Sequence, residues 1–179
     1  LTYLKRLGKA YGFKAEGFNI IRVNGRPVSS TLIRGLIKKG RIKEAASLLA
    51  RPASILGTVI KGTAVGRILG YPTANINPHH EVIPAPGIYA VRIILAINTL
   101  KGACYIGVRP TIHSRCKACR AKKKISVEAH IFNFNKNIYG KYLEIQFVKL
   151  IRPDKKFPSL TLLTQQIKKD VLAAKKILN

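Results

Sequence analysis

The segment from Gly57 to Asn75 is the richest in residues that could carry chemistry, because it combines closely spaced glycines with small polar side chains. Glycines let the backbone turn tightly and bring its N–H groups close to an anion such as a phosphate. The segment is not a Walker A loop, because no Gly-Lys-Ser or Gly-Lys-Thr ending follows the glycines. A glycine- and proline-rich turn without a binding role has the same composition, so both interpretations stay open.

Thr73 and Asn75 lie at the end of this segment and are separated by one residue. In an extended backbone, residues two apart point to the same side. A hydroxyl and an amide oxygen on one side suit a hard cation such as Mg²⁺, which prefers oxygen ligands. The spacing therefore indicates a candidate site for Mg²⁺ at Thr73 and Asn75.

Glu128 is a candidate general base. It lies in the run Ile125 to Ile131, where alternation puts the apolar residues on one face and leaves Glu128 and His130 on the other. A carboxylate in this position can accept a proton from a substrate hydroxyl. The alternative is a solvated residue on the outer face of a strand, which is the interpretation we adopt for His130.

The cysteines indicate a metal site only weakly. Cys116 and Cys119 have the two-residue spacing of half a zinc knuckle, but only Cys104 and His113 are available to complete the site. No arrangement typical of a Ser-His-Asp triad is present. Three unevenly placed cysteines do not form a disulfide scaffold, so we expect a reducing, cytoplasmic environment.

The elements that must position these residues change type along the chain. Apolar residues recur at helical spacing in 1–7, 32–37 and 42–49, with Ser29, Ser30 and Thr31 as N-cap candidates, and 18–23 resembles a short strand. From about residue 54, short strands follow one another without helices, which favours an antiparallel barrel or sandwich. We expect these strands at 55–60, 87–97, 102–108, 125–134 and 142–150, and an amphipathic helix over 160–178.

Charge is the most unusual bulk property. The 179 residues include 33 Lys and Arg but 7 Asp and Glu, which gives a formal net charge of +26. With 47% hydrophobic residues the chain can form a core, so a disordered basic tail is excluded, and no apolar run is long enough to span a membrane. The excess extends along the whole chain, and such a surface attracts polyanions, including RNA.

Several motifs, in order, resemble the bacterial bifunctional riboflavin kinase/FAD synthetase (FMN adenylyltransferase) family. The run from Gly62 to Asn75 is similar to the signature Gly-x-x-x-Gly-Arg-x-Leu-Gly-x-Pro-Thr-Ala-Asn of the riboflavin kinase domain. The resemblance spans about residues 51 to 178. The further similar segments are Pro86–Val91, Ile106–Thr111, Glu128–Phe132, Tyr139–Lys141, Arg152–Phe157 and Gln166–Asp170.

The resemblance implies two parts. Residues 51–179 would form a riboflavin kinase domain, a mainly β, compact antiparallel Greek-key barrel with a C-terminal helix. Residues 1–50 would be a short α/β remnant, the C-terminal tail of an FMN adenylyltransferase-like nucleotidyltransferase domain. The half that bears the family's His-x-Gly-His motif is absent from this sequence, so it would be a missing partner domain, and FAD synthesis is not expected from this chain alone. The remnant of the adenylyltransferase motif would be Ser29, Ser30, Thr31 and Arg34.

For the kinase part, the resemblance implies transfer of the γ-phosphoryl group of ATP to the 5′-hydroxyl of riboflavin, with FMN and ADP as products and Mg²⁺ as cofactor. Glu128 would be the catalytic base, and Thr73 and Asn75 would hold Mg²⁺ and the ATP phosphates. The other residues implied are Gly62, Gly66, Arg67, Gly70 and Pro72 at the ATP phosphates, and Arg109, Arg152 and Phe157 beside the flavin.

One departure and one alternative remain. Where the family has acids before Tyr139, this chain has Asn135 and Asn137 or, in an alignment one step earlier, Asn133 and Asn135; in either case we expect the asparagines to serve the turn and not catalysis. The alternative function is a riboflavin-kinase-like fold recruited as a basic, ribosome-associated RNA-binding protein, because a charge of +26 exceeds what a small-molecule kinase needs. We favour the kinase, since a pure RNA-binding protein has no reason to keep Thr73, Asn75 and Glu128 together.

Overall fold

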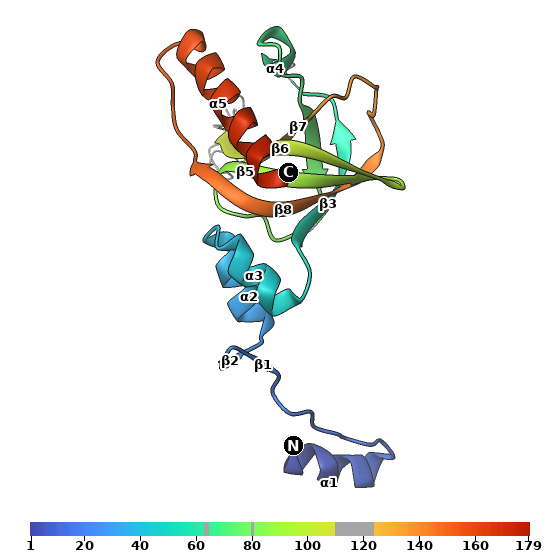
Figure 1. Ribbon diagram of the computed structural model, residues 1–179. Helices are drawn as coiled ribbons and strands as arrows, with labels where there is room; N and C mark the ends of the chain where they lie inside the picture. The colour runs from blue at the N-terminus through green and yellow to red at the C-terminus, as the bar shows by residue number, and fades with distance from the viewer. Residues whose placement is uncertain (63–64, 80, 110–123) are drawn as a thin grey trace, which may run out of the picture.

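The computed structural model describes residues 1–179 except 63–64, 80 and 110–123. Its centre is a closed barrel in which every neighbouring pair of strands is antiparallel (Figure 1). The strand order around the barrel is β3-β4-β7-β6-β5-β8. β4 to β7 thus lie in a Greek-key order, and the predicted mainly β fold is confirmed. The strands are β3 (Ala53–Ile60), β4 (Ala74–Pro78), β5 (Gly87–Leu95), β6 (Asn98–Arg109), β7 (Lys124–Ile131) and β8 (Tyr142–Pro153).

Alternate residues of the strands fill the barrel interior, as the period of two requires. The fully buried side chains include Ile55, Tyr89, Ile106 and Ile145. Tyr89 packs edge-on against Phe147, with ring centroids 5.2 Å apart, and donates its phenol hydrogen to the carbonyl of Ala85 (2.6 Å). Burial raises the pKa of Tyr89 to about 12, so this hydroxyl stays a neutral donor within the core.

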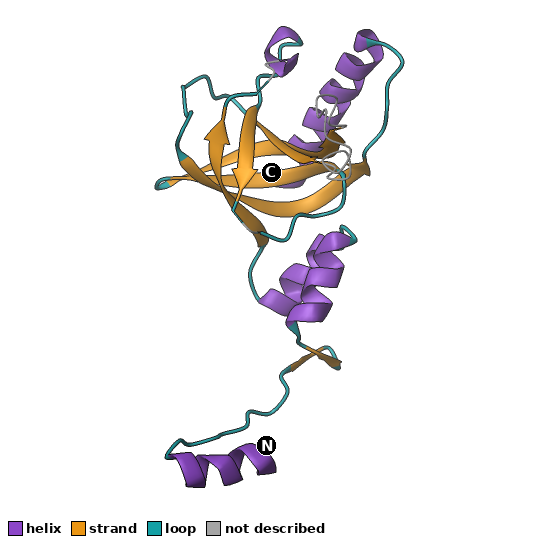
Figure 2. Ribbon diagram, turned by 180° about the vertical axis from the view of Figure 1, so that it is seen from behind, coloured by secondary structure: helices purple, strands orange, loops and turns teal. Residues whose placement is uncertain are grey.

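Helix α5 (Leu160–Leu178) covers the outer face of β5, β6 and β8 (Figures 1 and 2). The predicted C-terminal helix is therefore confirmed. Ser159 caps its first turn by accepting a hydrogen bond from the amide of Leu162 (3.3 Å). Near the other end, Ala174 and Leu178 pack against small residues of the sheet, Ala90 and Ala103. Small residues on both surfaces let the helix lie close to the barrel.

Helices α2 (Ser30–Lys38) and α3 (Ile42–Leu49) pack beside the opposite end of the barrel from α4 (Val65–Ile68) (Figures 1 and 2). Their apolar residues form a second small core with Ala53 at the start of β3. Of the predicted cap residues, Ser29 is the N-cap of α2, where it accepts a hydrogen bond from the amide of Leu32 (3.2 Å). The boundary between residues 50 and 51 stays a prediction.

Several sequence predictions were wrong at element ends. The chain begins with α1 (Thr2–Tyr11). The strand expected at 18–23 is reduced to the two residues of β1 (Arg22–Val23), which pair with β2 (Arg26–Pro27). β5 and β7 end earlier than expected, and just beyond them Ala96 and Asn133 adopt positive φ angles of 53°, which lie outside the β region. β4 and the short helix α4 were not predicted. Within the part of the chain that is described, no helix has both the length and the apolar character needed to cross a membrane.

Candidate active site

The register of β4 against β7 brings the predicted site residues together. Asn75 lies directly opposite Glu128 in the antiparallel pairing. Thr73, which precedes β4 by one residue, donates a hydrogen bond from Oγ1 to Glu128 Oε2 (3.3 Å). Ser126, two residues before Glu128 on the same face of β7, donates to Oε1 (3.0 Å). Glu128 is half-buried, and a hydrogen bond to each of its carboxylate oxygens fixes its orientation.

The glycines of the preceding segment lie against these polar side chains. A Cβ atom at Gly62 would stand 2.1 Å from Nδ2 of Asn75, and one at Gly66 would stand 2.5 Å from the carbonyl oxygen of Tyr71. A side chain at Gly66 would meet backbone, whereas one at Gly62 would require the Asn75 amide to move. Gly70 has a φ of 80°, in the left-handed region that glycine adopts without strain.

A pocket of about 740 Å³ lies between the outer face of β6 and β7 and helix α5. Its lining is mostly apolar, with a few charged groups among aromatic and aliphatic side chains. Ligand sites commonly combine an apolar wall with a few placed polar groups. The lining residues include Thr73, Tyr105, Glu128, His130, Arg152 and Phe157.

A second pocket, of about 520 Å³, opens beside the first. It is more polar, and Arg67, Thr73 and the segment from Phe134 to Tyr139 line it. In that segment the side chain of Asn137 accepts a hydrogen bond from the amide of Tyr139 (3.0 Å), a turn contact that agrees with the structural role expected for the asparagines. Thr73 lines both pockets, so they adjoin at the residue whose hydroxyl contacts Glu128.

Arg152 forms part of the wall of the larger pocket. Its Nη2 lies 2.8 Å from Oδ2 of Asp170 on α5, and its Nε lies 3.0 Å from both carboxylate oxygens. Asp170 is only 5% exposed and also accepts a hydrogen bond from Gln166 (2.9 Å). The guanidinium carbon lies 5.5 Å from the ring centre of Phe157. Since Asp170 balances its charge, Arg152 fixes the wall and is not a free cation.

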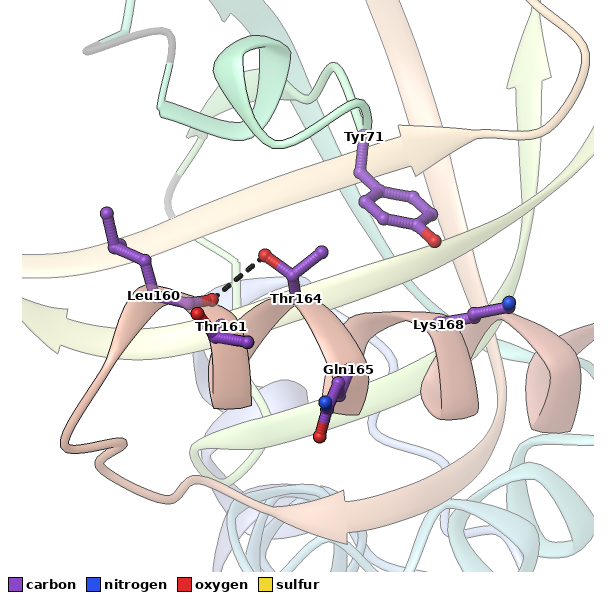
Figure 3. A pocket seen from close by; sticks show the side chains of 6 residues that line it. All are labelled: Tyr71, Leu160, Thr161, Thr164, Gln165 and Lys168. Atoms are coloured by element: carbon purple, nitrogen blue, oxygen red, sulfur yellow. Dashed lines mark hydrogen bonds between the residues drawn. The ribbon is translucent and has the colours of Figure 1, made fainter.

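A shallower hollow of about 420 Å³ separates Tyr71 from the exposed side of α5. Figure 3 shows Tyr71 projecting from its loop toward the helix, where Thr164 donates a hydrogen bond to the carbonyl of Leu160 (2.9 Å). Tyr71 and Leu160 line both this hollow and the larger pocket. Tyr71 therefore stands at the rim of the larger pocket, between the loop before β4 and the first turn of α5.

The remaining predicted residues lie in different places. Arg67 is exposed and, with Pro72, lines the second pocket. The backbone of Arg109 pairs with Lys124 at the end of β6, but its side chain is outside the described part. The predicted adenylyltransferase remnant lies at the start of α2, away from both pockets: Ser29, Ser30, Thr31 and Arg34.

The weak prediction of a zinc site falls mostly outside the described residues, which exclude Cys116, Cys119 and His113. Cys104 is fully buried on β6, and its burial raises the pKa of the thiol far above the usual range. Within the described ranges, no three His, Cys, Asp or Glu side chains are grouped so that they could hold a metal ion.

The sequence prediction gave no role to Tyr105 and Asp170, which line the larger pocket. Tyr105 is the register partner of Glu128 on β6, and its hydroxyl donates to Oδ2 of Asp154 (3.3 Å). Pairing the expected strands 102–108 and 125–134 would have identified Tyr105. The buried Asp170 was missed because nothing in the helix periodicity distinguishes an acid with a buried partner from an exposed one.

The sequence is similar to that of known proteins. A family model described as "Flavokinase: Riboflavin kinase" matches residues 49–178. The chain is 37% identical over 177 residues to a bifunctional riboflavin kinase/FMN adenylyltransferase of Haemophilus influenzae, and this match covers 98% of the chain and 55% of that protein. A protein of the same description from Buchnera aphidicola subsp. Schizaphis graminum is 39% identical over 181 residues, with 100% and 56% covered.

A solved structure is also similar. It is the crystal structure of a protein described as a macrolide-efflux protein from Streptococcus pneumoniae, with a TM-score of 0.77 and 30% identity. The match covers 93% of this chain and 52% of that one. The chain therefore spans about half the length of the curated relatives and of the solved chain that it matches.

Proposed function

The chain belongs to the riboflavin kinase family, and from that premise we propose that it transfers the γ-phosphoryl group of ATP to the 5′-hydroxyl of riboflavin, giving FMN and ADP. The observation that carries this proposal is the position of Thr73. Its hydroxyl contacts the candidate base Glu128, and the residue lines two adjacent pockets of different polarity. A reaction between two substrates needs such a meeting point, because phosphoryl transfer depends mostly on positioning and charge stabilisation.

The two pockets suit the two substrates. The larger one offers an apolar and aromatic wall, including Phe157 and Tyr105, to the flat ring system of a flavin. The second one places the cations of Arg67 and Lys136 beside a polar turn, which suits the negative charge of ATP. Gly62 and Gly66, which approach Asn75 and Thr73 closely, would bring backbone to the phosphates.

Glu128 would act as the general base on the flavin hydroxyl. Ser126 and Thr73 each donate a hydrogen bond to one of its oxygens, which fixes the carboxylate on the pocket side of β7. An ionised carboxylate has further lone pairs available, so a substrate hydroxyl in the larger pocket can still donate to it. A base held in this way takes up the proton as the hydroxyl oxygen bonds to phosphorus.

The donor set near Thr73 fits Mg²⁺. Because Thr73 donates its hydroxyl hydrogen to Glu128, the lone pairs of Oγ1 stay available to a cation. The Asn75 amide, packed against Gly62, supplies a second oxygen of the hard type that Mg²⁺ prefers. When bound, Mg²⁺ neutralises charge on the transferring phosphates. We propose Thr73 and Asn75 as the residues that hold it.

The experiment is an assay of the purified chain with riboflavin, ATP and Mg²⁺, in which FMN is separated and quantified by its fluorescence. We expect FMN that depends on ATP and is abolished by a chelator of divalent ions. Lumiflavin, which lacks the ribityl hydroxyl, is the matched control and should not be phosphorylated. A folded chain that forms no FMN and binds neither ATP nor riboflavin would contradict the proposal.

FMN is the proposed end product. The relatives are described as bifunctional, but we propose only the kinase step for residues 1–179, with the adenylyltransferase half as a partner domain for FAD synthesis. The same assay therefore should show no FAD. The use of ATP supports a cytoplasmic location.

A second candidate function, binding of RNA, is favoured by one observation, the net charge of +26. Exposed lysines on α5 and basic residues of α2 contribute to it on separate surfaces. Such a charge supports binding to a phosphate backbone without sequence preference. This function is compatible with the kinase reaction, because the basic surface lies largely outside the two pockets.

A further inference from the structure

The pairing of β4 with β7 stops just before the residue that joins the two pockets. The paired residues are Ala74 with Ala129, Asn75 with Glu128, and Ile76 with Val127. Pro72 has no N–H group and so cannot donate to a continued ladder. Thr73 and Pro72 therefore need another support if the Thr73 hydroxyl is to keep its place beside Glu128.

The side chain of His130 provides that support. Its Nδ1 lies 2.8 Å from the carbonyl oxygen of Pro72. A carbonyl oxygen only accepts hydrogen bonds, so Nδ1 carries the hydrogen and donates it. His130 lies two residues after Glu128 on the same face of β7 and lines the larger pocket. This side-chain hydrogen bond holds the carbonyl of Pro72 at the point where the strand pairing has ended.

Two aromatic neighbours hold the imidazole ring. Tyr71 and Phe132 contact it edge-on, each with ring centroids 5.6 Å apart, at interplanar angles of 79° and 64°. Tyr71 directly precedes Pro72, so the ring contact and the hydrogen bond act on the same short segment. A ring that is wedged in this way and bonded through Nδ1 holds the segment in a single position.

We propose that His130 is a positioning residue for phosphoryl transfer: it anchors the carbonyl of Pro72 and thereby sets the Thr73 hydroxyl against Glu128. This inference rests on the proposed function, since that reaction is what uses Thr73. A displacement of about 1 Å at a reacting group can cost about 100-fold in rate. Loss of the anchor should therefore reduce turnover and the use of MgATP more than the binding of riboflavin.

Two substitutions separate the hydrogen bond from the ring. His130→Phe keeps an aromatic ring between Tyr71 and Phe132 but removes the donor. His130→Asn removes the ring but places an amide N–H near the position of Nδ1. We expect His130→Phe to lower kcat/KM for MgATP by about 10- to 100-fold. His130→Asn should retain most of the activity, and in His130→Phe the Kd for riboflavin should change by a smaller factor than kcat/KM for MgATP.

His79 is the matched control. It is also half-buried, hydrogen-bonds through Nε2 to Thr58 (2.9 Å) and contacts Tyr142 edge-on with centroids 5.6 Å apart. It lines neither of the two pockets. His79→Phe should lose a comparable amount of stability, measured by thermal unfolding, without a change in kcat/KM for MgATP.

The possible outcomes distinguish the proposed function from the positioning role of His130. If the wild-type chain forms no FMN, both the proposed function and the role of His130 are wrong. If the wild-type chain forms FMN and His130→Phe matches His79→Phe in kcat/KM, only the positioning role is wrong. Should His130→Phe fail to fold, a His130→Asn variant with wild-type stability but no activity would overturn the role of the donor, and ¹⁵N NMR of the wild-type ring must show the hydrogen on Nδ1.

Discussion

At Glu128, strand register decides which groups meet the carboxylate. Thr73 is distant from it in the sequence, yet the pairing of β4 with β7 brings the two side chains within 3.3 Å. The alternation of β7 correctly predicted which face Glu128 occupies. It did not predict the half-buried environment, because Thr73, Tyr105 and α5 come from other parts of the chain.

Glu128→Gln should lower kcat by about 10²- to 10⁴-fold, because an amide keeps the shape of the side chain but cannot accept the proton. Initial rates of FMN formation, together with the Kd for riboflavin, measure this effect. Glu144→Gln is the control, since Glu144 is a half-buried strand glutamate on β8 that lines neither pocket. Activity of Glu128→Gln within about threefold of wild type would exclude the base role.

Gly62→Ala tests the contact with Asn75. The added Cβ would lie 2.1 Å from Nδ2, and the amide at the end of a flexible side chain is the group that must move. We expect the KM for MgATP to rise about tenfold, while the affinity for riboflavin stays unchanged. Steady-state kinetics with each substrate varied in turn measures both.

Gly35→Ala is the control for this prediction. Gly35 lies within α2 and has nothing within 4 Å of an added Cβ, so alanine should leave the kinetics unchanged and stabilise the helix by about 0.5–1 kcal/mol. An unaltered KM for MgATP in Gly62→Ala would show that the Asn75 amide does not serve the nucleotide.

At the scale of elements, the pocket depends on how α5 is fastened to β8. The buried ion pair between Arg152 and Asp170 joins them, and their side chains are only 19% and 6% exposed. A buried pair is not in itself strong evidence for stability, because desolvation offsets the attraction. Breaking it is costly, however, since one charge is left buried without its partner.

Asp170→Ala should therefore lower the free energy of unfolding by about 3–5 kcal/mol. In a double-mutant cycle with Arg152→Met, the combined loss should be smaller than the sum, because the second change removes the stranded charge. Urea unfolding of the four proteins measures the cycle, and Lys169→Ala, an exposed neighbour on α5, is the control. Strict additivity would mean that the two side chains do not act as a pair.

Periodicity predicted the elements that are long and regular, such as α5 and β8, but not the two that complete the site. β4 contains asparagine and proline, which are typical of turns, and it becomes a strand only because β3 and β7 lie on either side of it. α4 has only four residues and includes Gly66, so it shows no helical period. β4 thus depends on tertiary pairing, which one sequence does not reveal.

At the scale of the whole molecule, most basic side chains lie apart from the acids of the candidate site. The acids that the site uses, Glu128 and Asp170, are half-buried or buried and hydrogen-bonded, whereas most of the basic side chains are exposed. The net charge of +26 therefore describes the surface and predicts how it meets polyanions, independently of the reaction in the pockets.

The dependence on salt concentration should distinguish RNA binding from the kinase reaction. Binding of a single-stranded RNA should weaken by about 10³-fold or more between 50 and 200 mM salt, as bound phosphates release their counterions. The KM for riboflavin, an uncharged substrate, should hardly change over the same range. Fluorescence anisotropy with labelled RNA and the FMN assay measure the two responses. If RNA stays bound regardless of the salt concentration, or is not bound at 50 mM salt, the surface charge does not serve to bind RNA phosphates.

The shortness of β4 has a consequence for motion. It spans 5 residues, against 12 in each of β6 and β8, yet it joins β3 to β7 and so completes the barrel. Local unfolding begins where the fewest bonds must break, so the barrel should open first along this strand. Because Asn75 belongs to β4 and Thr73 adjoins it, a nucleotide held there would bind only the closed form. Protection of the β4 amides from hydrogen exchange should then increase as more of the site is occupied by nucleotide.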